Sequence, residues 1–244
     1  METAINKIKL KKLLKEAVEE VLVENKELFS DLIFEAVEDI ALIKAIKEGE
    51  NSQAVDREEI FKILNVQVKP TAPEPVKLFV GILYTDESLL EKAITLVVKK
   101  FGETDFESSV FEFKSSDYYK AEMGWPIFRE FVSFHDLINP KELAKIKIET
   151  NKIEDELTEK NMRKVNLDPG YMDTNKVVLA SAKFNAQKIY LDHGIYADPT
   201  LWYEKGKFEP YPFAFPDFKT NLYEKAFQHI RVLYKGQCRK LNST

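Results

Sequence analysis

The sequence predicts an α/β domain with a mixed sheet, preceded by a small all-helical segment. Two apolar stripes at helical spacing fill residues 7–46, and three prolines interrupt the chain between residues 66 and 76. Beyond the prolines, short apolar runs and helical stripes follow the order strand, helix, strand, strand, helix, strand. That order is typical of a split βαβ, ferredoxin-like core, to which later strands are added.

Composition narrows the class of protein. The 244 residues are 44% hydrophobic, which is enough to fill a core. Residues 1–65 hold 10 basic and 15 acidic residues, and the remainder holds 26 of each. Because neither part is basic, nucleic acid is not the expected partner.

The compartment follows from the cysteine count and from hydropathy. The single cysteine, Cys238, excludes an intrachain disulfide, and a reducing cytoplasm is the simplest location. No apolar run approaches the roughly 18 residues of a membrane span, so we expect no membrane partner.

The front segment, residues 1–65, is predicted to contain three helices. The first covers residues 7–24, and the second runs from Leu28 to Ile46 with Gly49 as its stop. Asp56 and Glu59 resemble a capping box that opens a third helix. Three short helices make a poor isolated core, so we expect residues 8–64 to pack on a protein partner, on another copy or on the rest of the chain.

Three stretches of this segment carry a family resemblance: KLKKLLKEAVEEVL, LIFEAVEDIALIKAIKEGE and DREEIFKIL. They resemble the small helical antitoxins that are encoded beside ribonuclease-type toxins. The resemblance implies a protein partner for residues 1–65. Residues 66–76, with Pro70, Pro73 and Pro75, are predicted to be an extended linker before a domain at 77–241.

The elements of this domain are read from periodicity and turn signals. Strands are expected at VKLFVGILY, SVFEFKS, FREFVSFHDLI, RKVNL, KVVLASAKF and KIYLDHG, with a hairpin at YEKGKF. Helices are expected after Asp86, after Pro140 and from Tyr223 to Tyr234.

From Pro73 to about Leu241 the chain resembles an uncharacterised bacterial family, a domain of unknown function whose members are often labelled GTP-binding protein. The blocks that carry the resemblance include PEPVKLFVGILY, SSDYYKAEMG, RKVNLDPGYM, KIYLDHGIYAD and YPFAFPDF. It implies no established activity. The sequence contains no GxxxxGK[ST] phosphate loop, which disfavours conventional GTP or ATP chemistry.

The candidate site centres on Asp168 in NLDPGY. Asp-Pro-Gly is good turn chemistry, but a turn alone does not require Asn166 and Tyr171 beside it. With the family resemblance added, we favour, narrowly, a strand-end loop whose Asp168 faces a pocket, with a structural turn as the alternative. Glu122 and Asp168 would form a carboxylate pair able to bind a divalent metal or to do acid–base work, and Arg163 would hold an anionic group.

Further candidates lie elsewhere in the chain. His193 stands between Asp192 and Gly194, where a plain turn is the stronger interpretation and catalysis the alternative. The remaining ligand-binding candidates are Asn151, Tyr196 and Asp198. The aromatic stretch from Trp202 to Phe218 is predicted to be an arm that covers the sheet, with base stacking as the weaker alternative.

Two functions remain open at this point. The first is binding of a small anionic or nucleotide-like ligand by the α/β domain, with metal-assisted hydrolysis as a possible activity. The alternative is a non-catalytic interaction protein whose antitoxin-like helices bind a partner or self-associate.

Overall fold

The computed structural model describes residues 7–24, 26–50, 70–114, 119–159, 162–185 and 187–241. By its contacts, the chain divides into two compact units, Met1–Thr71 and Ala72–Thr244. The helix predicted from Asp56 and residues 66–69 of the predicted linker lie outside the described residues. Within the described part, no helix is long and apolar enough to cross a membrane.

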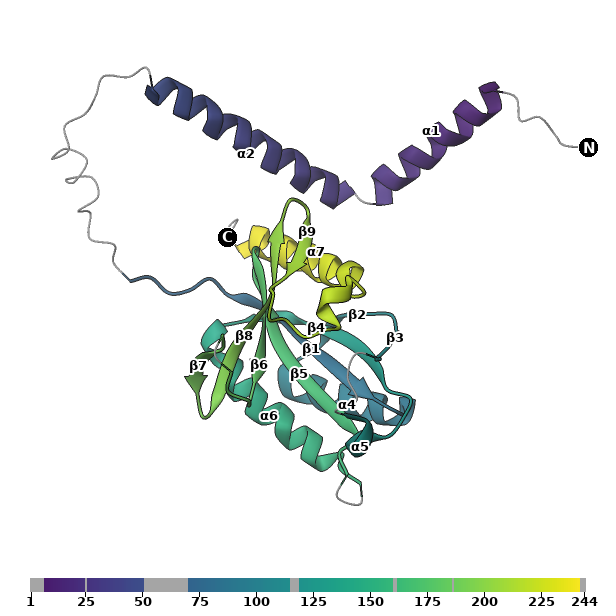
Figure 1. Ribbon diagram of the computed structural model, residues 1–244, viewed down its shortest axis with the longest axis vertical. Coiled ribbons are helices and arrows are strands. Elements are labelled where there is room, and N and C mark those ends of the chain that lie inside the picture. The colour runs from purple at the N-terminus through teal and green to yellow at the C-terminus, as the bar shows by residue number, and fades with distance from the viewer. Residues whose placement is uncertain are drawn as a thin grey trace, which may run out of the picture. The chain divides into compact units, whose positions relative to one another are not determined.

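The first unit contains the two predicted helices, α1 (Lys7–Glu24) and α2 (Lys26–Glu50) (Figure 1). Gly49 does not end α2, which continues to Glu50. On both helices the apolar side chains that are described lie exposed to solvent. The helical periodicity of the sequence is therefore confirmed, and the described residues of both apolar stripes are exposed.

The second unit begins with the predicted ferredoxin-like order. The six elements that follow this order are β1 (Val76–Tyr84), α4 (Glu87–Phe101), β2 (Thr104–Glu107), β4 (Phe128–Ile138), α6 (Leu143–Glu156) and β5 (Val165–Met172). The four strands lie in the sheet order β2-β4-β1-β5, and every pairing among them is antiparallel. This is the arrangement expected of a split βαβ core.

The sheet continues beyond β5 with strands that follow it in sequence. These are β6 (Lys176–Ser181), β7 (Ile189–Asp192), β8 (Ile195–Glu204) and β9 (Lys207–Pro210), arranged as β6-β8-β7 with β9 also paired to β8 (Figure 1). The predicted hairpin at YEKGKF is the β8–β9 turn.

One strand prediction needs correction. Of the predicted strand SVFEFKS, only Phe111 and Glu112 form a strand, β3, which pairs with β4. The second strand of the core is instead β2, with the sequence TDFE. Its pairing with β4 decides its conformation, because a four-residue run with one apolar residue shows no clear alternation.

The two faces of the core sheet are covered by different helices. Leu78, Val80 and Ile82 of β1 pack in one buried cluster with residues of α4 and α6. Phe79 of β1 points the other way, into an aromatic cluster with Phe227 of α7 (Glu224–Leu241). The side chains alternate because successive residues of a strand face opposite sides.

The end of α7 returns to the beginning of the second unit. The Tyr234 hydroxyl donates a 3.0 Å hydrogen bond to the carbonyl oxygen of Pro75. The Gln237 side-chain amide donates another, of 2.6 Å, to the carbonyl oxygen of His135 at the end of β4. These bonds join the last helix to the residue that precedes β1 and to β4, and β1 and β4 are the two central strands of the core sheet.

Candidate functional site

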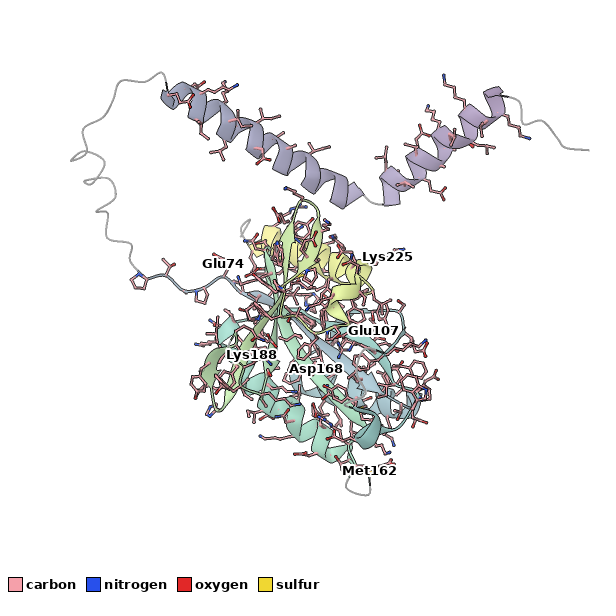
Figure 2. The ribbon with its side chains drawn as sticks, in the orientation of Figure 1. Glu74, Glu107, Met162, Asp168, Lys188 and Lys225 are labelled. Carbon is pink, nitrogen blue, oxygen red and sulfur yellow. The ribbon has the colours of Figure 1, made fainter. Side chains whose placement is uncertain are left out.

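The NLDPGY motif is not a corner between strands. All six residues lie within β5, where Asp168 is opposite Gly81 of β1 and Gly170 is opposite Phe79 (Figure 2). The prediction of a strand-end loop was therefore wrong. Val165 and Leu167 pack with the α4–α6 cluster, so that Asn166 and Asp168 project from the opposite face.

Gly170 occupies its position because the surrounding chain is too close for a side chain. A Cβ atom on Gly170 would lie 2.6 Å from Cζ of Phe79 and 2.7 Å from the carbonyl oxygen of Val178. Both distances are below van der Waals contact. The glycine is therefore a packing requirement of the β1–β5–β6 region and not a turn signal.

Pro169 is tolerated because β5 has only one partner strand over its first half. Pairing with β6 begins at Gly170, opposite Leu179, while β1 pairs with the whole of β5. Leu167 directs its backbone amide and carbonyl away from β1. Pro169 lies two residues further along β5, so its backbone faces the same way as that of Leu167. The N–H that proline lacks would thus point to the side from which β6 is absent.

Two side chains of α6 satisfy the backbone of Leu167 on this open side. Lys147 Nζ donates a 2.6 Å hydrogen bond to the Leu167 carbonyl, and a Glu154 carboxylate oxygen accepts a 2.8 Å hydrogen bond from the Leu167 amide. Lys147 and Glu154 also form an ion pair of 3.4 Å, and both are buried. They take the place that a neighbouring strand would have.

Arg163 joins the first group of predicted site residues. Its guanidinium donates hydrogen bonds of 2.9 Å to Asn166 Oδ1, 3.1 Å to Glu154 and 2.5 Å to Glu122. The guanidinium also lies 5.5 Å from the ring centre of Tyr119. The structure thus brings Glu122, Arg163 and Asn166 together, but Arg163 already faces two carboxylates.

Arg129, which is buried on β4, forms a second group with Asp168 and Asp217. Its guanidinium lies 3.0 Å from Asp168 and 2.5 Å from Asp217, and four aromatic rings surround it within 5.8 Å: those of Phe113, Phe131, Phe218 and Tyr223. Burial lowers the pKa of Arg129, but the two carboxylates outweigh burial and hold the pKa above its ordinary value. The arginine is therefore a permanent cation inside the domain.

Sequence reasoning missed Arg129 and Asp217. One signal was available for Arg129. It lies two residues before the buried Phe131 in FREFVSF, and alternate residues of a strand face the same side, so Arg129 faces the interior as Phe131 does. Asp217 offered none, because it is separated from Arg129 by 88 residues.

Two polar nitrogens in these groups have no hydrogen-bond partner among the residues that the structure describes. They are Nδ2 of Asn166, whose residue is 3% exposed, and Nε of Arg129. A buried donor without an acceptor costs about 1–3 kcal/mol. The amide of Asn166 is thus the one predicted ligand contact with an unused, buried donor.

The paired-carboxylate hypothesis is not supported by the contacts. Glu122 faces Arg163, whereas Asp168 faces Arg129. Over the described ranges, no group of three or more His, Cys, Asp or Glu side chains is placed to hold a metal ion. In the described residues Glu122 and Asp168 therefore face two different arginines and not each other, and a bound metal stays a prediction.

The remaining candidates lie on other elements. His193 and Gly194 form the β7–β8 turn with φ angles of 53° and 75°, as in a type I′ hairpin, and His193 pairs with Asp192. Tyr196 packs against the rings of Phe184 and Tyr190. No described hydrogen bond or ion pair joins either residue to Arg163 or Asp168.

Asp198, Asn151 and Tyr171 are also separate from the Arg163 group. Asp198 is buried on β8 and lies 3.0 Å from Lys188. Burial raises the pKa of Asp198 above its ordinary value, and the hydrogen bond from Lys188 opposes this shift. Asn151 is half-buried on α6, and burial raises the pKa of the half-buried Tyr171 on β5.

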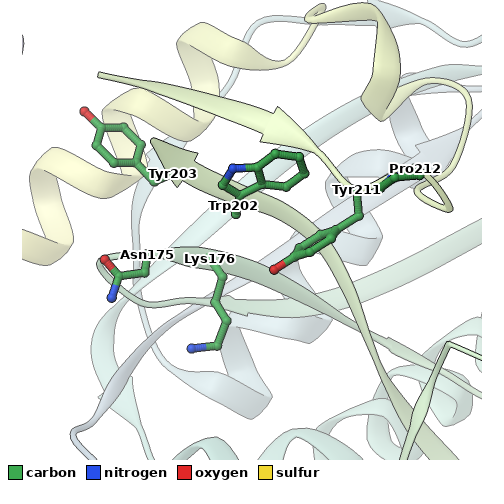
Figure 3. A pocket seen from close by; sticks show the side chains of 6 residues that line it. All are labelled: Asn175, Lys176, Trp202, Tyr203, Tyr211 and Pro212. Carbon is green, nitrogen blue, oxygen red and sulfur yellow. The ribbon is translucent and has the colours of Figure 1, made fainter. Parts of the chain in front are cut away.

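The aromatic segment from Trp202 to Phe218 lies partly in the core and partly around a pocket. Phe208 and Phe218 are buried in the cluster beneath α7, as expected of an arm that covers the sheet. Trp202 and Tyr211, with ring centres 4.9 Å apart, line an open pocket of about 480 Å³ together with Asn175, Lys176, Tyr203 and Pro212 (Figure 3).

Comparison with protein families gives two matches. Residues 74–234 match the model described as "Domain of unknown function (DUF4416)", and residues 2–44 match a RelB-like antitoxin model described as "Putative antitoxin family". No curated protein and no solved structure matches the chain. Because the first match covers well over half of its length, the chain belongs to the DUF4416 family of unknown function, here carrying an antitoxin-like segment in front.

Proposed function

We propose that the first unit is an antitoxin-like module that binds a basic protein partner of the ribonuclease-toxin class through α2. The observation that carries the proposal is the uncovered apolar surface of this helix. Ile33, Val37 and Ile40 are 57–66% exposed, and Leu42, Ile43 and Ile46 are 53–60% exposed. Apolar side chains exposed to this extent along one helix are typical of a protein interaction site.

The charge of α2 indicates the chemistry of the partner. Residues 26–50 include seven acidic and three basic residues. An enzyme that acts on RNA needs a basic surface for the phosphates, and an acidic helix is complementary to such a surface. The match to an antitoxin family over residues 2–44 supports the same class of partner.

Binding to a ribonuclease-type toxin tests the proposal. Val37→Asp with Ile40→Asp should weaken the complex by at least about tenfold, because charges replace the apolar anchor of the interface. Lys44→Ala, on an exposed position of the same helix, should change affinity by less than about twofold. Relief of toxin-induced growth arrest should follow the same ranking. Equal binding by all three chains, or none by the parent chain, would overturn the proposal.

We propose as a second candidate that the domain binds a small anionic or nucleotide-like ligand beside Asn166 and Asp168. The observation that favours it is the unpartnered, buried amide nitrogen of Asn166. Because Arg163 already pairs with Glu122, an anionic group would bind by replacing the Glu122 carboxylate, which is 45% exposed. These contacts support the binding part of the proposal.

A thermal-shift series with phosphate, ATP and GTP tests this second candidate. A ligand that binds only the folded state must raise its melting temperature. Glu122→Gln should strengthen the shift, since it removes the competing negative charge, and Asn166→Leu should abolish it. Glu142→Gln, on an exposed residue distant in sequence, is the control. A shift that is insensitive to both site variants would place the ligand elsewhere.

A further inference from the structure

The pocket beside β8 has two aromatic walls that meet at a corner. Trp202 lies on β8 and Tyr211 follows β9, and their ring planes meet at 58° with the ring centres 4.9 Å apart. The pocket volume of about 480 Å³ is in the range of small-molecule sites. A third flat ring can stack on one wall of this corner and touch the other wall with its edge (Figure 3).

Both walls are held in place by contacts within the domain. The backbone amide of Tyr211 donates a 3.1 Å hydrogen bond to the carbonyl oxygen of Thr200. The ring of Tyr211 stacks on that of Phe213, with ring centres 5.3 Å apart and planes at 13°. Nε1 of Trp202 donates a 3.3 Å hydrogen bond to Glu204. A pre-formed pocket is favourable for binding, because little side-chain freedom is lost when a ligand enters.

Lys176 supplies a positive charge beside the aromatic corner. It is the direct cross-strand partner of Trp202 in the β6–β8 ladder, so the two side chains lie on the same face of the sheet. Burial lowers the pKa of Lys176, but the hydrogen bond and the charge of Asp173 outweigh burial and hold the pKa above its ordinary value. The ammonium is therefore a cation at neutral pH, and its side chain is 42% exposed.

The carboxylate of Asp173 is directed into its own turn. One of its oxygens accepts hydrogen bonds of 2.8 Å from the backbone amides of Asn175 and Lys176, and the other accepts from the Lys176 ammonium. The Asp173 side chain is 20% exposed, half as much as that of Lys176. An ammonium has three N–H donors, and Asp173 accepts one of them. The polar side of the pocket thus presents donors to an incoming acceptor.

We propose that this pocket binds a planar aromatic carboxylate. The ring stacks in the corner between Trp202 and Tyr211, and the carboxylate accepts hydrogen bonds from the Lys176 ammonium. Figure 3 shows the Tyr211 hydroxyl on the Lys176 side of the pocket, where it can donate to the same carboxylate. Aromatic walls also attract cationic ligands, but the charge of Lys176 repels them.

The inference is independent of the ligand proposed beside Asn166 and Asp168. Those residues belong to β5, and the residues that line this pocket come from β6, β8 and the two segments that flank them: Asn175, Lys176, Trp202, Tyr203, Tyr211 and Pro212. Either proposal can therefore fail while the other holds.

Tryptophan fluorescence of the full chain tests binding at the corner. The chain has two tryptophans, and Trp125→Phe leaves Trp202 as the only one. Nicotinate should quench Trp202 saturably with a dissociation constant of about 1–10 mM, as expected of so small a ligand. In Trp202→Phe, the remaining Trp125 should show only unsaturable, collisional quenching. The absence of saturable quenching of Trp202 at up to about 30 mM nicotinate would overturn the proposal.

Matched probes measured by ligand-detected NMR test the chemistry. Nicotinamide, which has the same ring without the charge, should bind about three- to fivefold more weakly than nicotinate. Cyclohexanecarboxylate, which has the charge without a flat ring, should also bind more weakly, because it cannot stack. Equal dissociation constants for nicotinate and either of the other two probes would contradict the assigned ligand class.

Variants of the pocket complete the test. Lys176→Met should weaken nicotinate to the level of nicotinamide, whereas Lys207→Met, at a lysine whose side chain is 62% exposed on β9, should preserve the difference. Trp202→Leu should abolish binding of both probes, and Trp202→Phe, which keeps a ring, should retain part of it. Melting temperatures show whether each variant remains folded. Undiminished preference for nicotinate in Lys176→Met, or undiminished binding in Trp202→Leu, would overturn the proposal.

Discussion

The Lys147 ammonium donates to the carbonyl oxygen of Leu167, and the Glu154 carboxylate accepts from the amide of the same residue. One helix therefore completes the hydrogen bonding of a strand whose neighbour is missing. The arrangement needs both side chains, since each satisfies a different backbone group and each neutralises the other.

We expect Lys147→Met to destabilise the second unit by about 1–3 kcal/mol, because a buried carbonyl loses its donor. The exposed Lys145 on the same helix provides the control, and Lys145→Met should change the free energy of unfolding by less than about 0.5 kcal/mol. Urea denaturation measures both. Hydrogen exchange at the Leu167 amide should accelerate in Glu154→Leu. An amide that stays protected in that variant would contradict the assigned acceptor.

Gly170→Ala should be strongly destabilising, by more than about 2 kcal/mol, since overpacking in a rigid core forces backbone movement. The new Cβ would meet Phe79 and the backbone of Val178, which cannot both move aside. Gly236→Ala is the matched control, because a Cβ at this helical position meets nothing within 4 Å. It should stabilise by roughly 0.5–1 kcal/mol. Thermal melts of the two variants should therefore shift in opposite directions.

Arg129→Met should cost about 3–5 kcal/mol, because Asp217 would remain buried without its cation. Adding Asp217→Leu should recover much of this loss, since a well-packed apolar pair can replace a buried ion pair. Asp168→Asn should cost less than Asp217→Asn, because its side chain is 24% exposed and that of Asp217 only 4%. Denaturation of the four variants gives the ranking. Equal losses for the two asparagine variants would contradict it.

Glu130 should make stability depend on pH. Burial raises the pKa of the Glu130 carboxyl, although the hydrogen bond from Tyr84 favours ionisation. The folded state thus holds a proton that the unfolded state loses near the ordinary pKa. The stabilisation from this bound proton is fully present below the ordinary pKa of glutamate, and it is lost as pH rises through the pKa of Glu130 in the folded state. Relative to the parent, Glu130→Gln should become progressively more stable as pH rises through this window.

Limited proteolysis should cut first between residues 66 and 76 and leave a folded fragment from about residue 77 onward. Contacts divide the chain between Thr71 and Ala72, and Pro70, Thr71 and Pro73 are exposed. Exposed, extended backbone is the preferred site of cleavage. Mass spectrometry identifies the first cut. Initial cleavage within 78–100, which contains β1 and α4, would contradict the boundary.

The ferredoxin-like order was predictable because its periodicities are local. VKLFVGILY and FREFVSFHDLI carry strand patterns, and the helices between them repeat apolar residues at helical spacing. The β7–β8 turn was equally readable, since Asp-His-Gly is turn chemistry that needs no tertiary partner.

The β5 motif could not be read in this way. Pro169 and Gly170 are turn residues by local preference, but here one fits an open strand edge and the other a close approach of Phe79. Both reasons depend on where β6 and β1 lie. Likewise Glu122 and Arg163 could be placed in one group, whereas the link between Arg129 and Asp217 spans too much sequence to anticipate.

The position of α7 sets the order in which the second unit can be completed during synthesis. Phe79 and Phe131 lie early in this unit, but the residues that bury them, Phe227 and Ile230, belong to its last helix. A nascent chain that has finished β5 still exposes this aromatic face, and exposed apolar surface in incomplete chains favours aggregation. The second unit can therefore close only after α7 has been synthesised, and premature termination before α7 would release a chain that has its sheet but lacks the helix that covers one face of it.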